Sequence, residues 1–313
     1  MPRIKDAYLD CVIYLYPTEV DAEDGTRLGG SGFLVSVPTH DLPTNFLFIY
    51  AITNKHVAKN ARFIRMNSMD GRMKVYSTEN NSWYYHADGD DLAACLISFN
   101  PLDFKFAHVP RSQFLTLNIV NEYNVGPGDE VFSVGRFVNH EGKQRNLPAV
   151  RFGNISQMPS EPILQDDGFA QESFLCEIKS LAGYSGSPVF VHILPFSERE
   201  NVKNWLPGDN WLKENVFYEG FGSHGPWLLG VNWGHLNDWA PVCGNNKLPV
   251  NPDPELMQVK LNTGLATVVP AWKLAELLNS GSLAKDRNAI EDKARAGMLG
   301  QQSLSPNSFK TEA

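Results

Sequence analysis

The sequence predicts an all-β protein built from antiparallel barrels or sandwiches. Most of the chain consists of short apolar runs rich in β-branched and aromatic residues, with Gly, Pro, Asn and Asp between them. No long helical pattern separates these runs, as it would in a parallel sheet of alternating strands and helices. Strands at such short spacing are typical of barrels and sandwiches.

The expected strands are the runs in which apolar and β-branched residues are most concentrated. In chain order they are Cys11–Tyr16, Gly32–Val37, Phe46–Thr53, Arg62–Met66, Leu92–Phe99, Glu130–Val134, Ala149–Ile155, Phe174–Ile178, Pro188–Ile193, Trp227–Val231 and Gly264–Val268. Two stretches between them, Pro17–Gly30 and Pro195–Pro226, are expected to form long loops.

The helical signal is confined to the end of the chain. Pro270 suits the first position of a helix, and an apolar pattern follows it as far as Gly281. A second short helix is expected over Ile290–Met298. The polar residues Gln301–Ala313 are expected to be disordered.

Composition excludes several classes of function. The chain has 313 residues, of which 42% are hydrophobic and 20% charged, so it can bury a substantial core. Its net charge of −8 argues against a nucleic-acid partner, whose binding surface would be basic. No apolar run approaches the roughly 18 residues needed to span a bilayer, and the N-terminal residues do not resemble a signal peptide. We therefore expect no nucleic-acid partner and no membrane association; the oligomeric state is not indicated.

The four cysteines, Cys11, Cys95, Cys176 and Cys243, are scattered and form no Cys-x-x-Cys pair. This spacing does not match zinc or redox motifs. Three lie in apolar strand-like runs, where a cysteine usually acts as a small buried hydrophobe. We expect free thiols and a cytoplasmic, reducing location.

The segment Gly183-Tyr184-Ser185-Gly186-Ser187-Pro188 carries the strongest chemical signal. Glycines before and after a serine permit a sharp turn that exposes the hydroxyl and lets backbone N–H groups converge beside it. Such clusters are often plain turns, so the motif is weak alone.

Three further segments strengthen this interpretation. Thr53-Asn54-Lys55-His56-Val57 places a histidine directly after an apolar strand, and Asp90-Asp91-Leu92-Ala93 places a carboxylate directly before another. Asn232-Trp233-Gly234 ends a third strand. A serine, a histidine and a carboxylate are the groups of nucleophilic hydrolysis.

At these residues the chain resembles the trypsin-like serine peptidases, especially the bacterial glutamyl endopeptidases and HtrA-type proteases. Gly29–Val35, Val125–Gly135 and the segment from Thr263 through the closing helix are also similar to those groups, in the same order. The order His56, Asp91, Ser185 is that of chymotrypsin. The resemblance implies two antiparallel six-stranded β-barrels with a C-terminal helix, and a catalytic cleft between the barrels.

The resemblance also implies roles for individual residues. Ser185 would be the nucleophile, His56 the general base and Asp91 the carboxylate that orients the imidazole, while the backbone N–H groups of Gly183 and Ser185 would form the oxyanion hole. Such donors are typically worth about 2.7–4 kcal/mol each in the transition state. Asp90 is the alternative to Asp91 as the orienting carboxylate, but we expect it to be a solvated turn residue. No metal or organic cofactor is implied.

The substrate pocket implied by the resemblance has Lys179 and Ser180 on one side and Asn232, Trp233 and Gly234 on the other. This lining suits an acidic or uncharged polar side chain at the cleaved position, since a buried anion needs donors or a counter-charge. Asn232 stands where the glutamyl endopeptidases have a histidine, which weakens the expectation of glutamate specificity. The alternatives are a solvated Lys179 and a Trp233 that serves barrel packing.

We therefore expect a peptidase domain over residues 1–280, with barrels at about 8–145 and 146–270 and a closing helix at 270–280. A partly helical tail would follow over 281–313. The expected function is a serine endopeptidase acting on protein or peptide substrates. The alternative is a catalytically silent barrel that serves as a binding or scaffolding module, because fold does not fix function.

Overall fold

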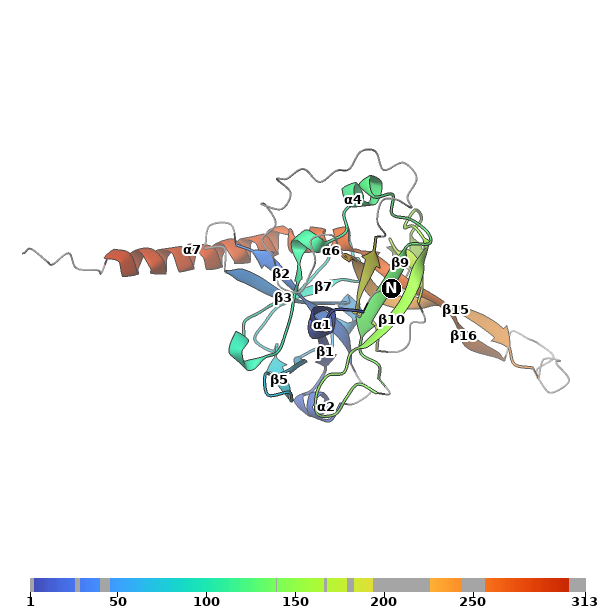
Figure 1. Cartoon of the computed structure of the whole chain (residues 1–313), viewed down its shortest axis with the longest axis horizontal. Helices are drawn as coiled ribbons and strands as arrows, with labels where there is room; N and C mark the ends of the chain where they lie inside the picture. Colours follow the sequence, from blue (N-terminus) through green and yellow to red (C-terminus); the bar gives the residue numbers. More distant parts are fainter. Residues whose placement is uncertain are drawn as a thin grey trace, which may run out of the picture.

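The computed structural model describes residues 3–25, 29–39, 46–138, 140–165, 168–178, 183–193, 226–243 and 257–303, with side chains as far as residue 296. Its strands form one open sheet from the N-terminal part of the chain and one closed barrel from the C-terminal part (Figure 1). No described helix is both long and apolar enough to cross a bilayer.

The N-terminal sheet has the strand order β5-β4-β1-β2-β3-β7-β6, and a short strand β8 pairs in parallel with β2. The short helix α1 precedes its first strand, and two further short helices, α2 and α3, lie between its strands. The elements are α1 (Asp6–Asp10), β1 (Val12–Tyr16), α2 (Glu19–Asp24), β2 (Gly30–Pro38), β3 (Leu47–Thr53), α3 (Lys55–Ala58), β4 (Phe63–Asn67), β5 (Met73–Ser77), β6 (Trp83–Tyr85), β7 (Ala93–Ile97) and β8 (Val109–Pro110).

The C-terminal barrel closes in the order β10-β13-β16-β15-β14-β9. Two short strands, β11 and β12, pair with each other outside the barrel. The elements are α4 (Leu117–Glu122), β9 (Glu130–Gly135), β10 (Ala149–Gln157), β11 (Ile163–Leu164), β12 (Ala170–Gln171), β13 (Phe174–Glu177), β14 (Pro188–His192), β15 (Trp227–Pro241) and β16 (Gln258–Pro270).

The two units share one hydrophobic core. Tyr8 of α1 packs edge-on against Phe132 and Phe190 of the barrel, with ring centroids 5.4 and 4.8 Å apart. The same cluster of buried residues includes Phe33 of β2 and Leu274 near the C-terminus. Because this core is continuous, it fixes the position of one unit relative to the other, and so the shape of the cleft between them.

Two helices end the described chain, α6 (Ala271–Leu278) and α7 (Gly281–Ser303). Pro270 is the N-cap of α6, which buries Leu274, Leu277 and Leu278 against the core. In Figure 1, α7 and the long β15–β16 hairpin extend from opposite ends of the molecule.

The predicted fold class is confirmed, with corrections of detail. The first unit is an open sheet among the described residues, and not a closed six-stranded barrel. The expected division near residue 145 is wrong for β9, because this strand is hydrogen-bonded between β10 and β14 of the second unit. Local sequence does not reveal which distant strand a segment will pair with.

Some predicted loops and tails also differ. Helix α2 lies within the stretch expected to be a loop over 17–30, and α7 replaces the short helix expected over 290–298 and extends past residue 301. Most of the expected loop over 195–226 and residues 304–313 lie outside the described residues.

Candidate active site

Strand pairing brings His56 and Asp91 together. His56 lies in α3, directly after β3, and Asp91 lies two residues before β7 begins. The strands β3 and β7 are antiparallel neighbours, and Thr53 is paired with Ala93 at this end of the ladder. The residues that follow one strand and precede the other must therefore meet at the same edge of the sheet.

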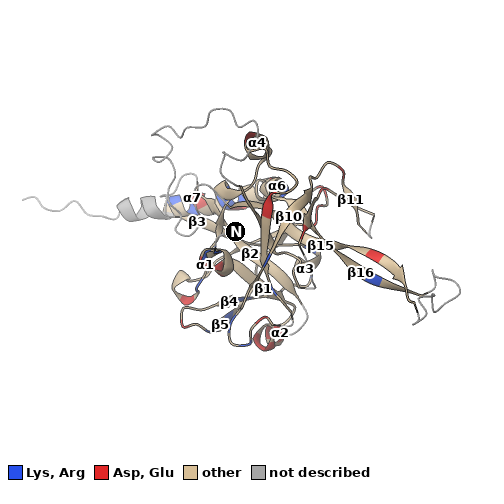
Figure 2. Cartoon of the chain, turned by 45° about the vertical axis from the view of Figure 1, so that its right-hand side comes forward, with Lys and Arg blue, Asp and Glu red and all other residues tan. Residues whose placement is uncertain are grey.

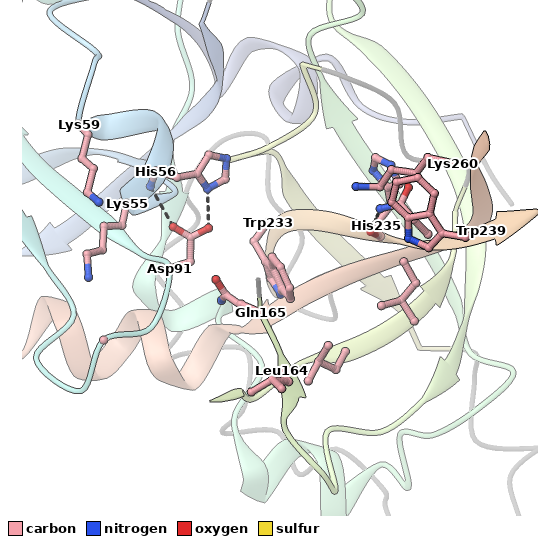
Figure 3. Close-up of a pocket in the computed structure, with 14 residues that line it drawn as sticks. Lys55, His56, Lys59, Asp91, Leu164, Gln165, Trp233, His235, Trp239 and Lys260 are labelled. Carbon is pink, nitrogen blue, oxygen red and sulfur yellow. Dashed lines mark hydrogen bonds and ion pairs between the residues drawn. The ribbon is translucent and has the colours of Figure 1, made fainter. Parts of the chain in front are cut away.

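The His56 and Asp91 side chains form a close pair (Figure 3). His56 Nδ1 lies 2.6 Å from Asp91 Oδ2, and the backbone N–H of His56 donates to Asp91 Oδ1 at 3.0 Å. The Asp91 side chain is 10% exposed and that of His56 is 50% exposed. A carboxylate on Nδ1 favours the tautomer that carries its proton there, which leaves Nε2 free to accept a proton.

The backbone carbonyl and the backbone N–H of Asp91 are both held by hydrogen bonds. Asn54 Nδ2 donates to the Asp91 carbonyl at 2.8 Å, and the Asp91 N–H donates to Gln171 Oε1 at 2.9 Å. Gln171 lies in β12, is fully buried, and donates through Nε2 to Asp90 Oδ1 at 2.6 Å. One glutamine from the C-terminal half therefore holds both consecutive aspartates of the N-terminal half.

The expectation that Asp90 is a solvated turn residue is wrong. Asp90 is 3% exposed, and its Oδ2 lies 2.9 Å from Nδ1 of the buried His86. Burial alone would lower the pKa of His86, but the hydrogen bond and charge of Asp90 raise it. Burial alone would likewise raise the pKa of Asp90, but His86 and Lys273 lower it. Asp90 thus stays charged in a buried ion pair.

The cluster around His86 is the described group whose ligand atoms come close enough to hold a metal. His86, Asp88 and Glu276 each offer one such atom, all within 4.8 Å of one another. Both ring nitrogens of His86 already face carboxylates, Asp90 at 2.9 Å and Glu276 at 3.3 Å, and the Lys273 ammonium lies 3.5 Å from Glu276. This arrangement fits a protonated imidazole among carboxylates better than a metal ligand.

Ser185 lies on a tight turn whose glycines adopt left-handed backbone conformations. Gly183 has φ +94° and Gly186 has φ +86°, and the N–H of Ser187 donates to the Tyr184 carbonyl at 2.9 Å. Among the described residues, no acceptor binds the backbone N–H of Gly183 or of Ser185. Both N–H groups named for an oxyanion hole are therefore available to a ligand.

The serine turn is hydrogen-bonded to β2 of the N-terminal sheet. The N–H of Ser31 donates to the Ser185 carbonyl at 2.9 Å, and the Ser31 hydroxyl donates to the Gly183 carbonyl at 2.7 Å. Ser31 is itself held, since its carbonyl accepts from the Thr53 hydroxyl at 2.7 Å. A Cβ at Gly186 would lie 2.0 Å from the Ser31 carbonyl oxygen, so only glycine allows this approach.

Ser185 and His56 line a common cavity of about 630 Å³, together with Gly183. Among the described residues, the hydrogen-bond acceptor of the Ser185 hydroxyl is the Trp233 carbonyl, at 3.4 Å, and not His56 Nε2. Serine–histidine hydrogen bonds are often loose in unliganded enzymes and tighten when substrate binds.

Trp233 is the extra residue of a β-bulge. Asn232 is paired with Val268 and Gly234 with Thr267, which leaves Trp233 without a partner in the β15–β16 ladder. Bulges next to active sites redirect a side chain. Here the indole Nε1 donates to Ser173 Oγ at 2.8 Å and the ring lines a second cavity, of about 600 Å³, beside His56.

Asn232 is buried, and its side-chain oxygen accepts the Gly234 N–H at 3.2 Å. Its carbonyl accepts the Gly186 N–H at 2.8 Å, so it also supports the serine turn. Lys179 and Ser180 lie outside the described residues, and the pocket predicted from them stays a prediction.

Sequence reasoning missed several residues of this site. Ser31 carried a signal, since it lies in the glycine-rich segment Gly29–Gly32, but its contact with the serine turn was not inferred. Gln171 and the extension of β15 past Val231 carried none, because their roles depend on contacts far apart in sequence.

Comparison with known protein families finds a match over the middle of the chain. The family description "Trypsin-like peptidase domain" matches residues 30–192, which is more than half of the chain. No curated protein sequence matched.

Several solved structures are similar in outline. The MamO protease domain from Magnetospirillum magneticum has 16% identity and a TM-score of 0.49, over 88% of this chain and 98% of that one. A serine endoprotease from Yersinia pestis has 15% identity and a TM-score of 0.44, over 91% and 68%. The HtrA-type protease AlgW with tripeptide has 14% identity and a TM-score of 0.43, over 87% of this chain and 61% of AlgW. On the extent of the family match, the protein belongs to the trypsin-like peptidase domain family.

Proposed function

We propose that the protein is a serine endopeptidase that cleaves peptide bonds through Ser185, His56 and Asp91. The observation that carries the proposal is the 2.6 Å contact between His56 and Asp91, together with the cavity that both His56 and Ser185 line. His56, oriented by Asp91, is a base in the same cavity as Ser185, which lies on the glycine-containing turn.

In the proposed reaction, the Ser185 hydroxyl turns from the Trp233 carbonyl toward His56 and attacks the carbonyl carbon of the scissile bond. His56 Nε2 takes the hydroxyl proton and returns it to the leaving amine, which departs as the carbon–nitrogen bond breaks. A water molecule then repeats the sequence on the ester and releases the acid. Asp91 stays ionised and stabilises the imidazolium.

The backbone N–H groups of Gly183 and Ser185 would bind the oxygen of the tetrahedral intermediate. Their availability among the described residues supports this role. Backbone donors cost little reorganisation during the reaction, because the glycine-containing turn already fixes their direction.

The open edge of β15 supports an extended peptide as the substrate. Strand β14 pairs with β15 only as far as Val231, and the described pairs beyond Asn232 all lie on the β16 side. The other edge therefore has backbone groups that can pair with an added strand. For the cleaved position we keep the proposal of an acidic or uncharged polar side chain, contacted by Lys179, Ser180 and Asn232–Gly234.

A second candidate is a silent binding module that retains the fold. The hydrogen bond of Ser185 to Trp233, in place of His56, is the observation in its favour. The two candidates differ in whether Ser185 reacts.

The test is hydrolysis of a mixed peptide library by the wild-type protein and by Ser185→Ala, with products identified by mass spectrometry. The variant should keep the unfolding transition, because one hydroxyl with a 3.4 Å contact carries little stability. Its hydrolysis should fall by several orders of magnitude, as when triad members act as a unit. Equal cleavage by both proteins would contradict the peptidase mechanism.

We also propose a reducing, cytoplasmic location, which the cysteines support. All four are free, and burial raises the pKa of both Cys95 and Cys176 to about 12, so these two thiols are poorly reactive.

A further inference from the structure

We propose that the cavity between α3 and the β15–β16 hairpin selects peptides with acidic side chains remote from the scissile bond, and that Lys260 binds those side chains. The proposal rests on the peptidase function, and names the substrate class that the site prefers. The cavity measures about 600 Å³ and extends from His56 and Trp233 to Trp239 and Lys260 (Figure 3).

The charge of the cavity is opposite to that of the whole chain. The protein carries a net charge of −8, whereas the cavity is lined by Lys55, Lys59 and Lys260. Among the described lining residues, Asp91 is the one carboxylate, and both of its oxygens face His56. Among the described residues, none of the three lysines forms an ion pair, so their charges are available to a ligand.

The cationic groups lie at two separate places. Lys55 and Lys59 lie on the far side of the His56–Asp91 pair from Trp233, and Lys260 lies with His235 and Trp239 at the hairpin (Figure 3). The apolar ring of Trp233 lies between them. An extended peptide bound along β15 would run from the catalytic residues toward the hairpin group.

The hairpin group is built by cross-strand pairing. Trp239 and Lys260 are directly opposite each other in the β15–β16 ladder, and the Lys260 ammonium lies 5.8 Å from the centroid of the Trp239 ring. Burial and the nearby charge of Lys260 lower the pKa of His235. Among the described residues that line this end of the cavity, no carboxylate lies beside Lys260.

Acidic and basic positions both occur on the hairpin (Figure 2), but they lie on different sides of it. Asp238 does not line the cavity, and its carboxylate accepts the Trp239 N–H at 2.8 Å. Side chains alternate along a strand, so Asp238 faces away from the side that Trp239 presents. Among the described residues on the cavity side of the hairpin, Lys260 has no ion-pair partner. The exposed Trp239 ring lies beside it and can cover the stem of a glutamate.

The length of the strand sets where an acidic residue should lie. Trp239 lies six positions after Trp233, and at roughly 3.3 Å per residue this corresponds to roughly 20 Å. A peptide paired with β15 would thus reach Lys260 about five or six residues from the part that covers Trp233. The preference should therefore be for acidic residues well away from the cleaved bond, and on one side of it only.

The experiment compares fluorescein-labelled peptides in which one position at a time, on either side of a cleaved bond, is Glu or Gln. We expect Glu about five or six residues away, on one side, to raise kcat/KM by about two- to fivefold, which is the range of an exposed ion pair. The gain should appear in KM and disappear at high salt, because exposed charges are screened. Lys260→Gln should abolish the preference, while Lys285→Gln, with the same charge change on α7, should retain it.

Binding to the Ser185→Ala protein, measured by fluorescence anisotropy, separates this proposal from the proposed function. If the wild-type protein cleaves nothing but Ser185→Ala binds Glu peptides more tightly than Gln peptides through Lys260, the peptidase proposal fails and the acidic preference holds. Equal affinity for Glu and Gln peptides at low salt, or a preference that survives Lys260→Gln, would overturn the inference.

Discussion

Replacement of Gly186 by alanine should test whether the packing of the serine turn against the N-terminal sheet sets the position of Ser185. This effect can be measured apart from the loss of stability. The Cβ of the introduced alanine would lie 2.0 Å from the Ser31 carbonyl oxygen and 2.2 Å from Thr53 Oγ1. Both atoms belong to the N-terminal sheet and are held by the hydrogen bond that joins them. The turn must therefore move away from the sheet, and it carries Ser185 with it.

The magnitude follows from two contributions. Gly186 has φ +86°, where an alanine costs about 1–2 kcal/mol through backbone strain. Overpacking against fixed atoms adds about 1–3 kcal/mol. Gly264 has the same φ of +86° but no atom within 4 Å of an added Cβ, so Gly264→Ala should show the strain alone. The difference between the two variants isolates the contact with Ser31.

Denaturant unfolding and the rate of reaction with a fluorophosphonate are the two assays. Gly264→Ala should lose stability and keep the wild-type labelling rate. Gly186→Ala should lose more stability and label at least about tenfold more slowly, because about 1.4 kcal/mol of lost transition-state stabilisation corresponds to a factor of ten. If the two variants label at equal rates, the packing of the serine turn against β2 does not set the position of Ser185.

Three further predictions concern the residues around Asp91. Asp91→Asn should lower kcat roughly 10⁴-fold with little loss of fold, because an amide favours the wrong tautomer of His56; kinetics and circular dichroism check this. Gln171→Leu should lower the free energy of unfolding by about 1–3 kcal/mol, since it leaves the buried Asp91 N–H without its acceptor. It should also shift the pH profile of kcat/KM, which a purely structural loss would not move. For the pair of His86 and Asp90, the raised pKa of the histidine gives stability that is complete below its ordinary value of 6.5 and is lost as the pH rises through the raised pKa. The lowered pKa of Asp90 gives stability that is complete above its ordinary value of 3.8 and is lost as the pH falls through the lowered pKa. His86→Gln should therefore be destabilised most between about pH 4 and 6.5, and a wild-type minus variant difference that grows toward alkaline pH would contradict this assignment.

The sequence was informative where chemistry and local pattern coincide. The strand before His56 and the strand after Asp91 are continuous apolar runs, and the structure pairs them directly. The glycines on either side of Ser185 predicted a turn with unusual backbone angles, which Gly183 and Gly186 adopt. These features depend on a few adjacent residues, so they can be recognised without knowledge of the fold.

The remaining features depend on contacts that span the chain. Asp90 resembled a solvated turn residue because its partners His86, Gln171 and Lys273 come from three separate segments. Strand β9 has the same apolar character as its neighbours in sequence, yet its pairing places it in the second unit. No local pattern indicates such pairing, since register and neighbours are decided by the packed core.

The central claim is that Ser185 is an activated nucleophile, and reaction with a fluorophosphonate tests it without knowledge of the substrate. The protein is incubated with the reagent across a range of pH and the adduct is located by mass spectrometry of a digest. We predict a single adduct on Ser185, with no adduct in Ser185→Ala. A folded wild-type protein that gains no adduct, or one that reacts at another serine, would contradict the account.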